Sequence, residues 1–253
     1  MATRKLYEKN TYLFTTQATI LSTRIDVASK LWVIFDQTIF YPQGGGQPSD
    51  SGFIVQNDTA SPVLAARMNY ETRQVEHHID AKSDVVVGQI VTMEIDKEKR
   101  LLHSRLHSAG HLLDYAIDLL RIPLVGVKGY HFPEKPFVEY QAADGQNISE
   151  LATPLALSEL KSRMMSKCQE LIKFALSITT EEIDPRNIEE PLRSKIPAKA
   201  FESDVVRLIK FDGSKEPGPC GGTHVSNTSE IGPSFSIDQI TFKKGIVRIL
   251  YNL

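Results

Sequence analysis

The chain has 253 residues with a formal net charge of −2, which allows one large or two small domains around an ample core. The slight negative charge argues against a general nucleic-acid binder, since phosphate affinity comes largely from Lys and Arg. No apolar run approaches the roughly 20 residues of a membrane helix, and two cysteines leave no disulfide framework.

Residues 1–95 are predicted to form a small β-barrel domain. The polar stretch Met1–Asn10 lacks the apolar core of a signal peptide, so we expect a cytoplasmic location. Short segments rich in β-branched, apolar and aromatic residues follow, separated by polar stretches, and each is typical of a strand. They are Ala18–Leu21 and Lys30–Phe35, and the longer segment Val85–Ile95 has the apolar pattern of a pair of strands.

A glycine-rich stretch lies inside this strand region. Gly44, Gly45 and Gly46 form a backbone that no side chain crowds and that can adopt positive φ. The stretch is either a wide turn after a strand or a loop that approaches a ligand closely. In the second interpretation, Gln47 and Asp50 are the polar residues placed to use it.

The segment from Asp96 to Arg121 is predicted to be a helix that carries two metal ligands. Asp96 is a good N-cap residue, and apolar residues recur at three- and four-residue steps after it. His107 and His111 are four residues apart, so they lie on one face and can bind one ion together. Such a pair alone is usually a solvated helix face. His103, one turn earlier, is expected to be a neighbour of the site or a surface residue.

The elements that follow indicate an α+β domain over residues 96–253. Cys168 lies in the second predicted helix and is expected to pack there. A closing hairpin is predicted to turn at Lys243, Lys244 and Gly245. The predicted strands are Val125–Tyr130, Pro136–Gln141, Val205–Phe211, Ser234–Phe242 and Ile246–Tyr251, and the second helix is Leu157–Ile172.

A second pair of ligands lies in a loop rich in Pro and Gly. Cys220 and His224 are again four residues apart, and with His107 and His111 they offer three imidazoles and one thiolate. That set suits four-coordinate zinc, so we predict one Zn²⁺ per chain. Metalloproteases carry a Glu beside the first His, where this chain has Ser108, which weakens a peptidase interpretation.

Several blocks of the chain resemble the AlaX family, the trans-editing proteins related to the editing domain of alanyl-tRNA synthetase. The resemblance extends from about Thr11 to Ile249. The ligand blocks alone are also similar to the editing domain of threonyl-tRNA synthetases, whereas the glycine-rich block points to the alanine system. The blocks are Phe40–Gly52, Arg100–His107, Phe137–Tyr140 and Cys220–Thr228.

The resemblance implies a fold and a reaction. The fold would be an N-terminal β-barrel followed by an α/β sandwich of the threonyl/alanyl-tRNA synthetase second-additional-domain type, which binds zinc. The reaction would be hydrolysis of the ester on mischarged tRNA(Ala), chiefly Ser-tRNA(Ala) and also Gly-tRNA(Ala), with Ala-tRNA(Ala) spared. Zinc would either activate water or hold the substrate's amine, and the sequence leaves both open, together with the identity of the general base.

Candidate residues for substrate and tRNA follow from these expectations. Those for catalysis or substrate binding are Ser108, Gly129, Gly221, Gly222 and Thr223. The expected partner is the acceptor end of tRNA(Ala), and the candidate cations for it are Arg100, Arg105, Lys243 and Lys244. No obligate protein partner is indicated. Two other classes stay open: a zinc-stabilised tRNA-binding module without catalysis, and a zinc hydrolase of small esters or amides.

Overall fold

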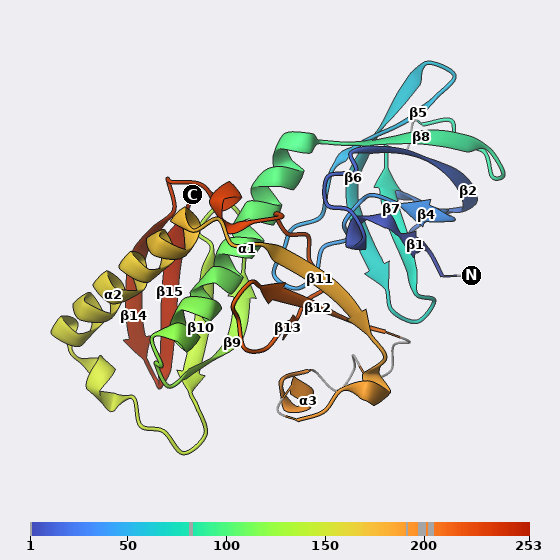
Figure 1. The fold of residues 1–253 in the computed structure, drawn as a ribbon. Coiled ribbons are helices and arrows are strands. Elements are labelled where there is room, and N and C mark those ends of the chain that lie inside the picture. The colour runs from blue at the N-terminus through green and yellow to red at the C-terminus, as the bar shows by residue number, and fades with distance from the viewer. Residues whose placement is uncertain (1, 81–82, 191, 197–200, 202–204) are drawn as a thin grey trace. The chain divides into compact units, whose positions relative to one another are not determined.

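The computed structural model describes residues 2–80, 83–190, 192–196, 201 and 205–253 (Figure 1). The chain divides into two compact units, residues 1–104 and 105–253. The division falls inside α1 (Lys97–Leu119). The domain boundary expected at residues 95 and 96, which assigns this whole helix to the second domain, stays a prediction. Among the described residues, every helix is too short or too polar to span a lipid bilayer.

The first unit is built on a closed barrel of six strands in the order β2-β3-β7-β6-β5-β8. Closure pairs every strand on both sides, so the barrel has no open edge. Alternate side chains, such as Val33, Phe35 and Met93, fill its interior. The expected barrel is therefore confirmed. The strands are β2 (Thr15–Ile25), β3 (Leu31–Phe35), β5 (Gly52–Gln56), β6 (Thr59–Asn69), β7 (Gln74–Ile79) and β8 (Ile90–Ile95).

Smaller elements complete this unit. The strand β1 (Arg4–Lys5) pairs in parallel with β4 (Gln37–Thr38), and a 3-10 helix covers Leu6–Glu8.

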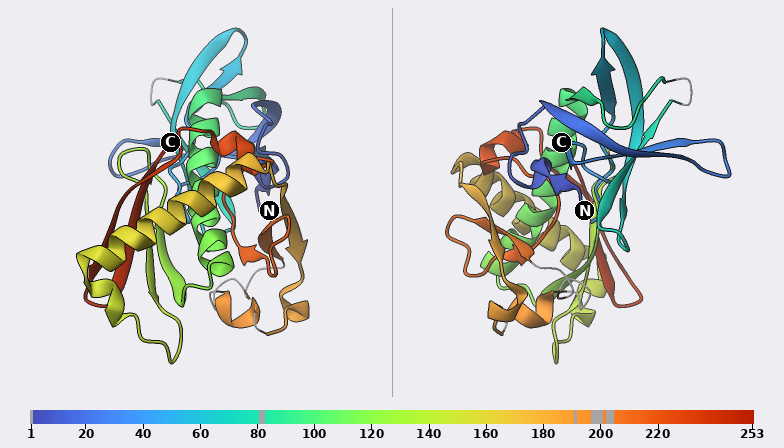
Figure 2. Two further views of the ribbon diagram at one scale, coloured as in Figure 1. Left: turned by 60° about the vertical axis from the view of Figure 1, so that its left-hand side comes forward. Right: turned by 90° about the vertical axis from the view of Figure 1, so that its right-hand side faces the viewer.

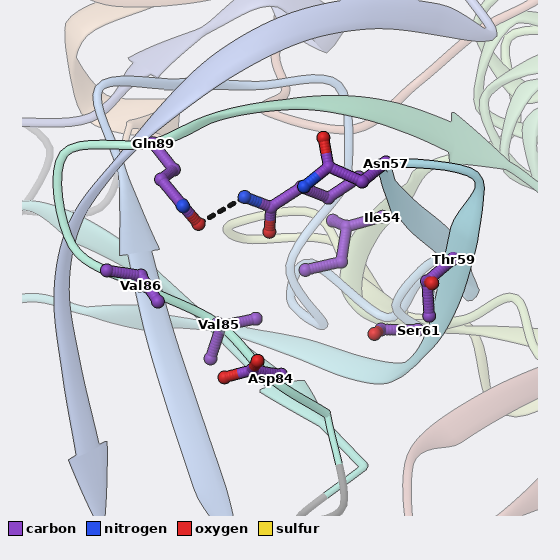
Figure 3. A pocket seen from close by; sticks show the side chains of 9 residues that line it. Ile54, Asn57, Thr59, Ser61, Asp84, Val85, Val86 and Gln89 are labelled. Atoms are coloured by element: carbon purple, nitrogen blue, oxygen red, sulfur yellow. Dashed lines mark hydrogen bonds between the residues drawn. The ribbon is translucent and has the colours of Figure 1, made fainter.

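A cavity of about 150 Å³ lies in the barrel region, beside the β5–β6 turn (Figure 3). Most of its polar lining is uncharged, and the side-chain amide of Gln56 donates to that of Gln89 across it. No residue predicted for the functional site lines this cavity.

The second unit is a sandwich of helices and antiparallel sheets. The main sheet has the order β14-β15-β10-β9, and β11, β12 and β13 form a smaller one. Figure 2 shows α2 along one face of the main sheet. Contacts of α1 with Tyr140 and Tyr251 place α1 on this same face. The strands are β9 (Leu124–Tyr130), β10 (Phe137–Ala142), β11 (Ile178–Ile183), β12 (Val206–Phe211), β13 (Gly218–Pro219), β14 (Ser236–Lys243) and β15 (Ile246–Asn252).

The helices of the second unit begin at clear local signals. The side chain of Thr153 accepts from Ala156 N–H, and Pro154 occupies the first turn of α2 (Pro154–Lys173). The helix therefore starts three residues before the predicted Leu157. Cys168 is fully buried in α2, and burial raises the pKa of its thiol to about 12, as expected for a packed residue. The other helical segments are α3 (Leu192–Lys195) and the 3-10 turns Ser149–Ala152, Pro185–Asn187 and Thr228–Ile231.

A buried ion pair holds the start of α1 in the first unit. Asp96 caps the helix as predicted, since its carboxylate accepts from Lys99 N–H at 3.1 Å. One turn later, Arg100 is fully buried and pairs with Asp50, which is 1% exposed. The guanidinium also donates to the carbonyls of Thr11 and Ile39. Each of the three guanidinium nitrogens therefore has a fixed acceptor in place of water, as a buried charge requires.

Asp50→Ala should destabilise the first unit by about 3–5 kcal/mol, because Arg100 would remain buried without its counter-charge. Urea unfolding followed by circular dichroism measures the change in the free energy of unfolding. Asp84→Ala removes an exposed carboxylate from the same unit and serves as the control, with little expected change. Equal midpoints for the two variants would contradict the role assigned to the pair.

Candidate functional site

Four predicted ligands meet within the second unit. His107 and His111 project from α1, while Cys220 and His224 lie in the loop after β13. One ligand atom from each residue lies within 4.8 Å of all the others. Cys220 Sγ is 3.4 Å from His107 Nε2 and 3.2 Å from His224 Nε2. Tetrahedral zinc separates its nitrogen and sulfur ligands by roughly 3.5 Å, so the donor set and its spacing fit this ion.

Electrostatics favour the ligand forms of three of these side chains, His107, His224 and Cys220. Burial, reinforced by neighbouring cations and rings, sets the pKa of both His107 and His224 well below the ordinary value, which keeps them neutral. Burial opposes ionisation of Cys220, but His111, Gly222 N–H and Arg207 outweigh it and lower the pKa of the thiol. Burial likewise opposes protonation of His111, yet the thiolate and Asp114 raise its pKa to about 10. A metal ion would displace the proton from the His111 ring, since side chains bind metals in their deprotonated forms.

Ser108 joins the helix to the ligand loop. Its side chain is fully buried, and its Oγ accepts from Val225 N–H at 3.2 Å. The same oxygen lies 3.2 Å from His224 Nδ1, which leaves Nε2 of that ring facing the cluster. Burial and these two contacts give the hydroxyl a role in positioning His224, and the substrate-binding role expected for Ser108 stays a prediction.

Two further residues orient the cluster from outside. Asp114 lies 3.4 Å from His111 Nδ1 and accepts from Tyr140 Oη at 2.8 Å. A carboxylate behind a ligating imidazole fixes its ring and raises its basicity. Arg207 donates to the carbonyls of Cys220 and Gly222 at 2.9 and 2.7 Å, which fixes the course of the ligand loop.

His131 is a fifth component that the sequence interpretation missed. Its ring stacks on His107 with centroids 4.4 Å apart, and its Nδ1 lies 2.6 Å from Tyr251 Oη. Burial, together with the charge of His111, lowers the pKa of His131 to about 3. A Cβ at Gly110 would lie 2.4 Å from this ring, and one at Gly129 would lie 2.5 Å from it. A glycine inside a helix is unfavourable without such a reason, so Gly110 was the available signal.

The remaining candidates in this unit occupy different positions. Gly129 lies in β9 and makes room for the His131 ring. Gly222 is buried, and its N–H points to Cys220 Sγ at 3.4 Å, so that donor holds the thiolate. Thr223 is fully buried. Gly221 is exposed, and a Cβ there would meet nothing within 4 Å, so its backbone faces open space. His103 is buried in the first unit and is not a member of the ligand group.

The glycine-rich stretch forms a tight two-residue hairpin in the first unit. Gly44 and Gln47 pair through both backbone bonds, and Gly45 and Gly46 have φ of 53° and 76°. Positive φ at both central positions requires glycine or a residue that tolerates it. The prediction that Gln47 and Asp50 face a ligand is corrected. Both side chains are buried, and Asp50 is committed to Arg100 and to Tyr41 N–H.

The cations proposed for tRNA differ in availability. Lys243 and Lys244 are exposed at the β14–β15 turn, as expected. Arg105 is half-buried, and its guanidinium donates to the carbonyl of Ile231 at 2.8 Å. Arg100 is fully buried in the ion pair described above, so the prediction that it contacts tRNA is wrong. Its polar neighbourhood in the sequence suggested exposure, whereas Asp50 provides a buried partner.

Comparison with known proteins gives one family match in each unit. Residues 4–99 match the family described as tRNA synthetases class II (A), and residues 206–249 match the threonyl and alanyl tRNA synthetase second additional domain. The chain is 28% identical over 265 residues to an alanine–tRNA ligase of Caldivirga maquilingensis, covering 98% of this chain and 26% of that protein. It is 30% identical over 228 residues to the putative alanyl-tRNA editing protein alaX of Saccharomyces cerevisiae, covering 85% and 48%.

These matches place the chain in the class of proteins that share the editing region of alanyl-tRNA synthetases. The first match contains the glycine hairpin, and the second contains the Cys220–His224 ligand pair. Within this class the chain belongs with the AlaX-like proteins, as the resemblance of its motifs implied. It spans about half or less of the length of these two relatives.

Purified protein should contain about one zinc per chain, and Cys220→Ala should lose most of it because the thiolate supplies one of four bonds. Elemental analysis by mass spectrometry measures the metal content. Cys168→Ala is the matched control, since this other cysteine is buried in α2, outside the cluster. Full zinc retention in Cys220→Ala, or an equal loss in both variants, would contradict the assignment.

Proposed function

We propose that the protein removes the amino acid from mischarged tRNA(Ala) in trans by hydrolysing the ester at the tRNA 3′ end. The observation that carries this proposal is the His107, His111, Cys220 and His224 cluster, located in a chain that matches the second additional domain. The yeast relative is named a putative alanyl-tRNA editing protein, and other relatives are named alanine–tRNA ligases. Both kinds of protein share the region that this chain covers.

The side chains around the cluster supply positioning for this reaction. When bound by the four ligands, zinc supplies positive charge that polarises a neighbouring water or carbonyl group. Ser108 and Asp114 keep His224 and His111 aimed at a common point. Gly221 N–H is our candidate donor to the oxyanion that develops on the ester carbonyl, because this residue faces open space beside Cys220. An aminoacyl ester is reactive, so positioning of this kind contributes much of the needed acceleration.

Selectivity for seryl over alanyl esters follows from hydrogen bonding. A synthetase pocket built for alanine rejects serine and glycine poorly, because they differ by one hydroxyl or one methyl group. A second site that bonds the serine hydroxyl disfavours alanine, since alanine would leave a buried polar group unpaired. We therefore expect Ser-tRNA(Ala) to be the main substrate and Ala-tRNA(Ala) to be spared. Glycine lacks the same hydroxyl, so our expectation that Gly-tRNA(Ala) is also accepted rests on the resemblance to the AlaX family and not on this hydrogen bond.

A deacylation assay with the protein alone should show release of serine from Ser-tRNA(Ala) and little release of alanine from Ala-tRNA(Ala). His107→Ala should abolish turnover at any substrate concentration, because it removes a ligand. His78→Ala, a histidine of the first unit outside the cluster, should retain activity. Equal rates on the seryl and alanyl esters would refute the selectivity, and inactivity on every charged tRNA would refute the function. Turnover of small esters without tRNA would instead favour a general hydrolase.

The glycine hairpin provides a second test. Gly45 is exposed and has positive φ, so valine is strained there, whereas asparagine tolerates this conformation. Gly45→Asn preserves the turn but adds a side chain. If the backbone approaches the substrate closely, Gly45→Asn should lower deacylation several-fold with unchanged zinc content and circular dichroism. Loss of activity only in Gly45→Val, together with a lower melting temperature, would show that the glycine serves the turn alone.

A further inference from the structure

The main sheet of the second unit has one buried and one open face. In β10, Val138 and Tyr140 are buried, while Phe137 and Glu139 on the opposite face are half-buried. In β15, the exposed Arg248 lies between two buried residues. The cross-strand pairs extend this second face across the sheet, because paired residues share a side. Tyr130 pairs with Phe137, and Glu139 pairs with both Lys128 and Arg248.

Aromatic rings form a column on this open face. The Phe132 and Tyr130 rings are 4.5 Å apart at 11°, and the Tyr130 and Phe137 rings are 5.3 Å apart at 19°. The guanidinium of Arg248 lies 4.4 Å from the centre of the Phe137 ring, and Lys128 Nζ lies 5.7 Å from it. None of the three aromatic residues is fully buried. The column therefore presents flat rings and a stacked guanidinium at the surface rather than in the core.

The charge of this face is positive. Glu139 is its acid among the cross-strand pairs above, and Arg248 neutralises it through an Nε–Oε1 bond of 2.8 Å. The Arg248 side chain is still 46% exposed, against 16% for Glu139. Lys128 is exposed, and Lys243 and Lys244 extend the positive charge to the turn at the end of β14. Two further acids adjoin this face: Glu134 in the loop between Phe132 and Phe137, and the exposed Asp238 of β14, which accepts from Ser236 Oγ at 3.1 Å.

We propose that this open face binds unpaired nucleotides of RNA, with a base stacking on the outer face of the Phe132 ring, at the end of the column, and phosphates meeting Lys128, Arg248 and Lys243. RNA-binding domains use aromatic residues on an open four-stranded sheet for this purpose, because every base has a flat face. A paired helix would keep its bases stacked inside, so single strands are favoured. The identity of the RNA rests on the proposed function, since a charged tRNA ends in unpaired nucleotides.

Binding of a fluorescent single-stranded RNA with the sequence of a tRNA 3′ end tests this inference by fluorescence anisotropy. Phe132→Leu keeps an apolar side chain but removes the flat ring, and it should weaken binding by roughly ten-fold. Lys128→Gln should reduce the slope of log Kd against log salt by about 0.7, the value for one phosphate contact on a single strand. The controls are Phe174→Leu, an aromatic residue 62% exposed elsewhere in this unit, and Lys173→Gln at the end of α2.

Several outcomes separate this inference from the proposed function. Unchanged RNA binding in Phe132→Leu and Lys128→Gln, with wild-type deacylation intact, would overturn the inference alone. If both variants lose RNA binding but the wild-type protein deacylates no tRNA, the open face is supported as an RNA-binding surface and the proposed deacylase function is refuted. Equal affinity for a duplex of the same sequence would overturn the inference of a single-strand site. A wild-type dimer that Phe132→Leu converts to a monomer would also overturn it, because the open face would then be a contact between two copies of the chain. If Phe132→Leu does not fold, the salt slope of Lys128→Gln decides.

Discussion

The hydroxyl of Ser108 is the contact on which the candidate site depends. The two ligand segments are 113 residues apart between His107 and Cys220, so local helix geometry aligns only half of the cluster. Ser108 stands in α1 and receives the Val225 N–H from the second segment while lying against His224. Because the hydroxyl is fully buried, water cannot replace these contacts. Asp114 and Arg207 act within each segment: Asp114 orients the His111 ring, and Arg207 binds the carbonyls of the ligand loop.

The ligands could be predicted because they follow from local periodicity and a donor set that few ions share. Four-residue spacing on a helix places His107 and His111 together, and a Pro- and Gly-rich loop accounts for the other pair. The closure of the barrel, which pairs β2 with the distant β8, was implied by the resemblance. Individual strand segments of the barrel and the final hairpin were readable from β-branched residues and from the turn at Lys244 and Gly245, where the structure has positive φ values. These features need information only from neighbouring residues.

The parts that sequence could not show are those decided by a distant partner. Arg100 resembles a surface cation until Asp50, fifty residues earlier, is seen to pair with it inside the first unit. The role of Ser108 depends on a residue 117 positions later. His131 became visible only through the space that Gly110 and Gly129 leave. Likewise, a net charge of −2 over the chain concealed the local cations beside Phe137. Totals over a sequence do not report how side chains gather on one face.

The burial of Cys168 has a practical consequence for chemistry at the ligand cluster. The chain has two cysteines, and the thiol in α2 is fully covered, with a pKa near 12 that leaves almost no thiolate at neutral pH. Thiolates are the species that alkylating reagents attack. Cys220 has the opposite character, because its surroundings lower the pKa of its thiol. A thiol-directed probe will therefore label the native chain at Cys220 alone. The rate of that reaction will report, without any substitution, whether the Cys220 sulfur is free or bound to a metal ion.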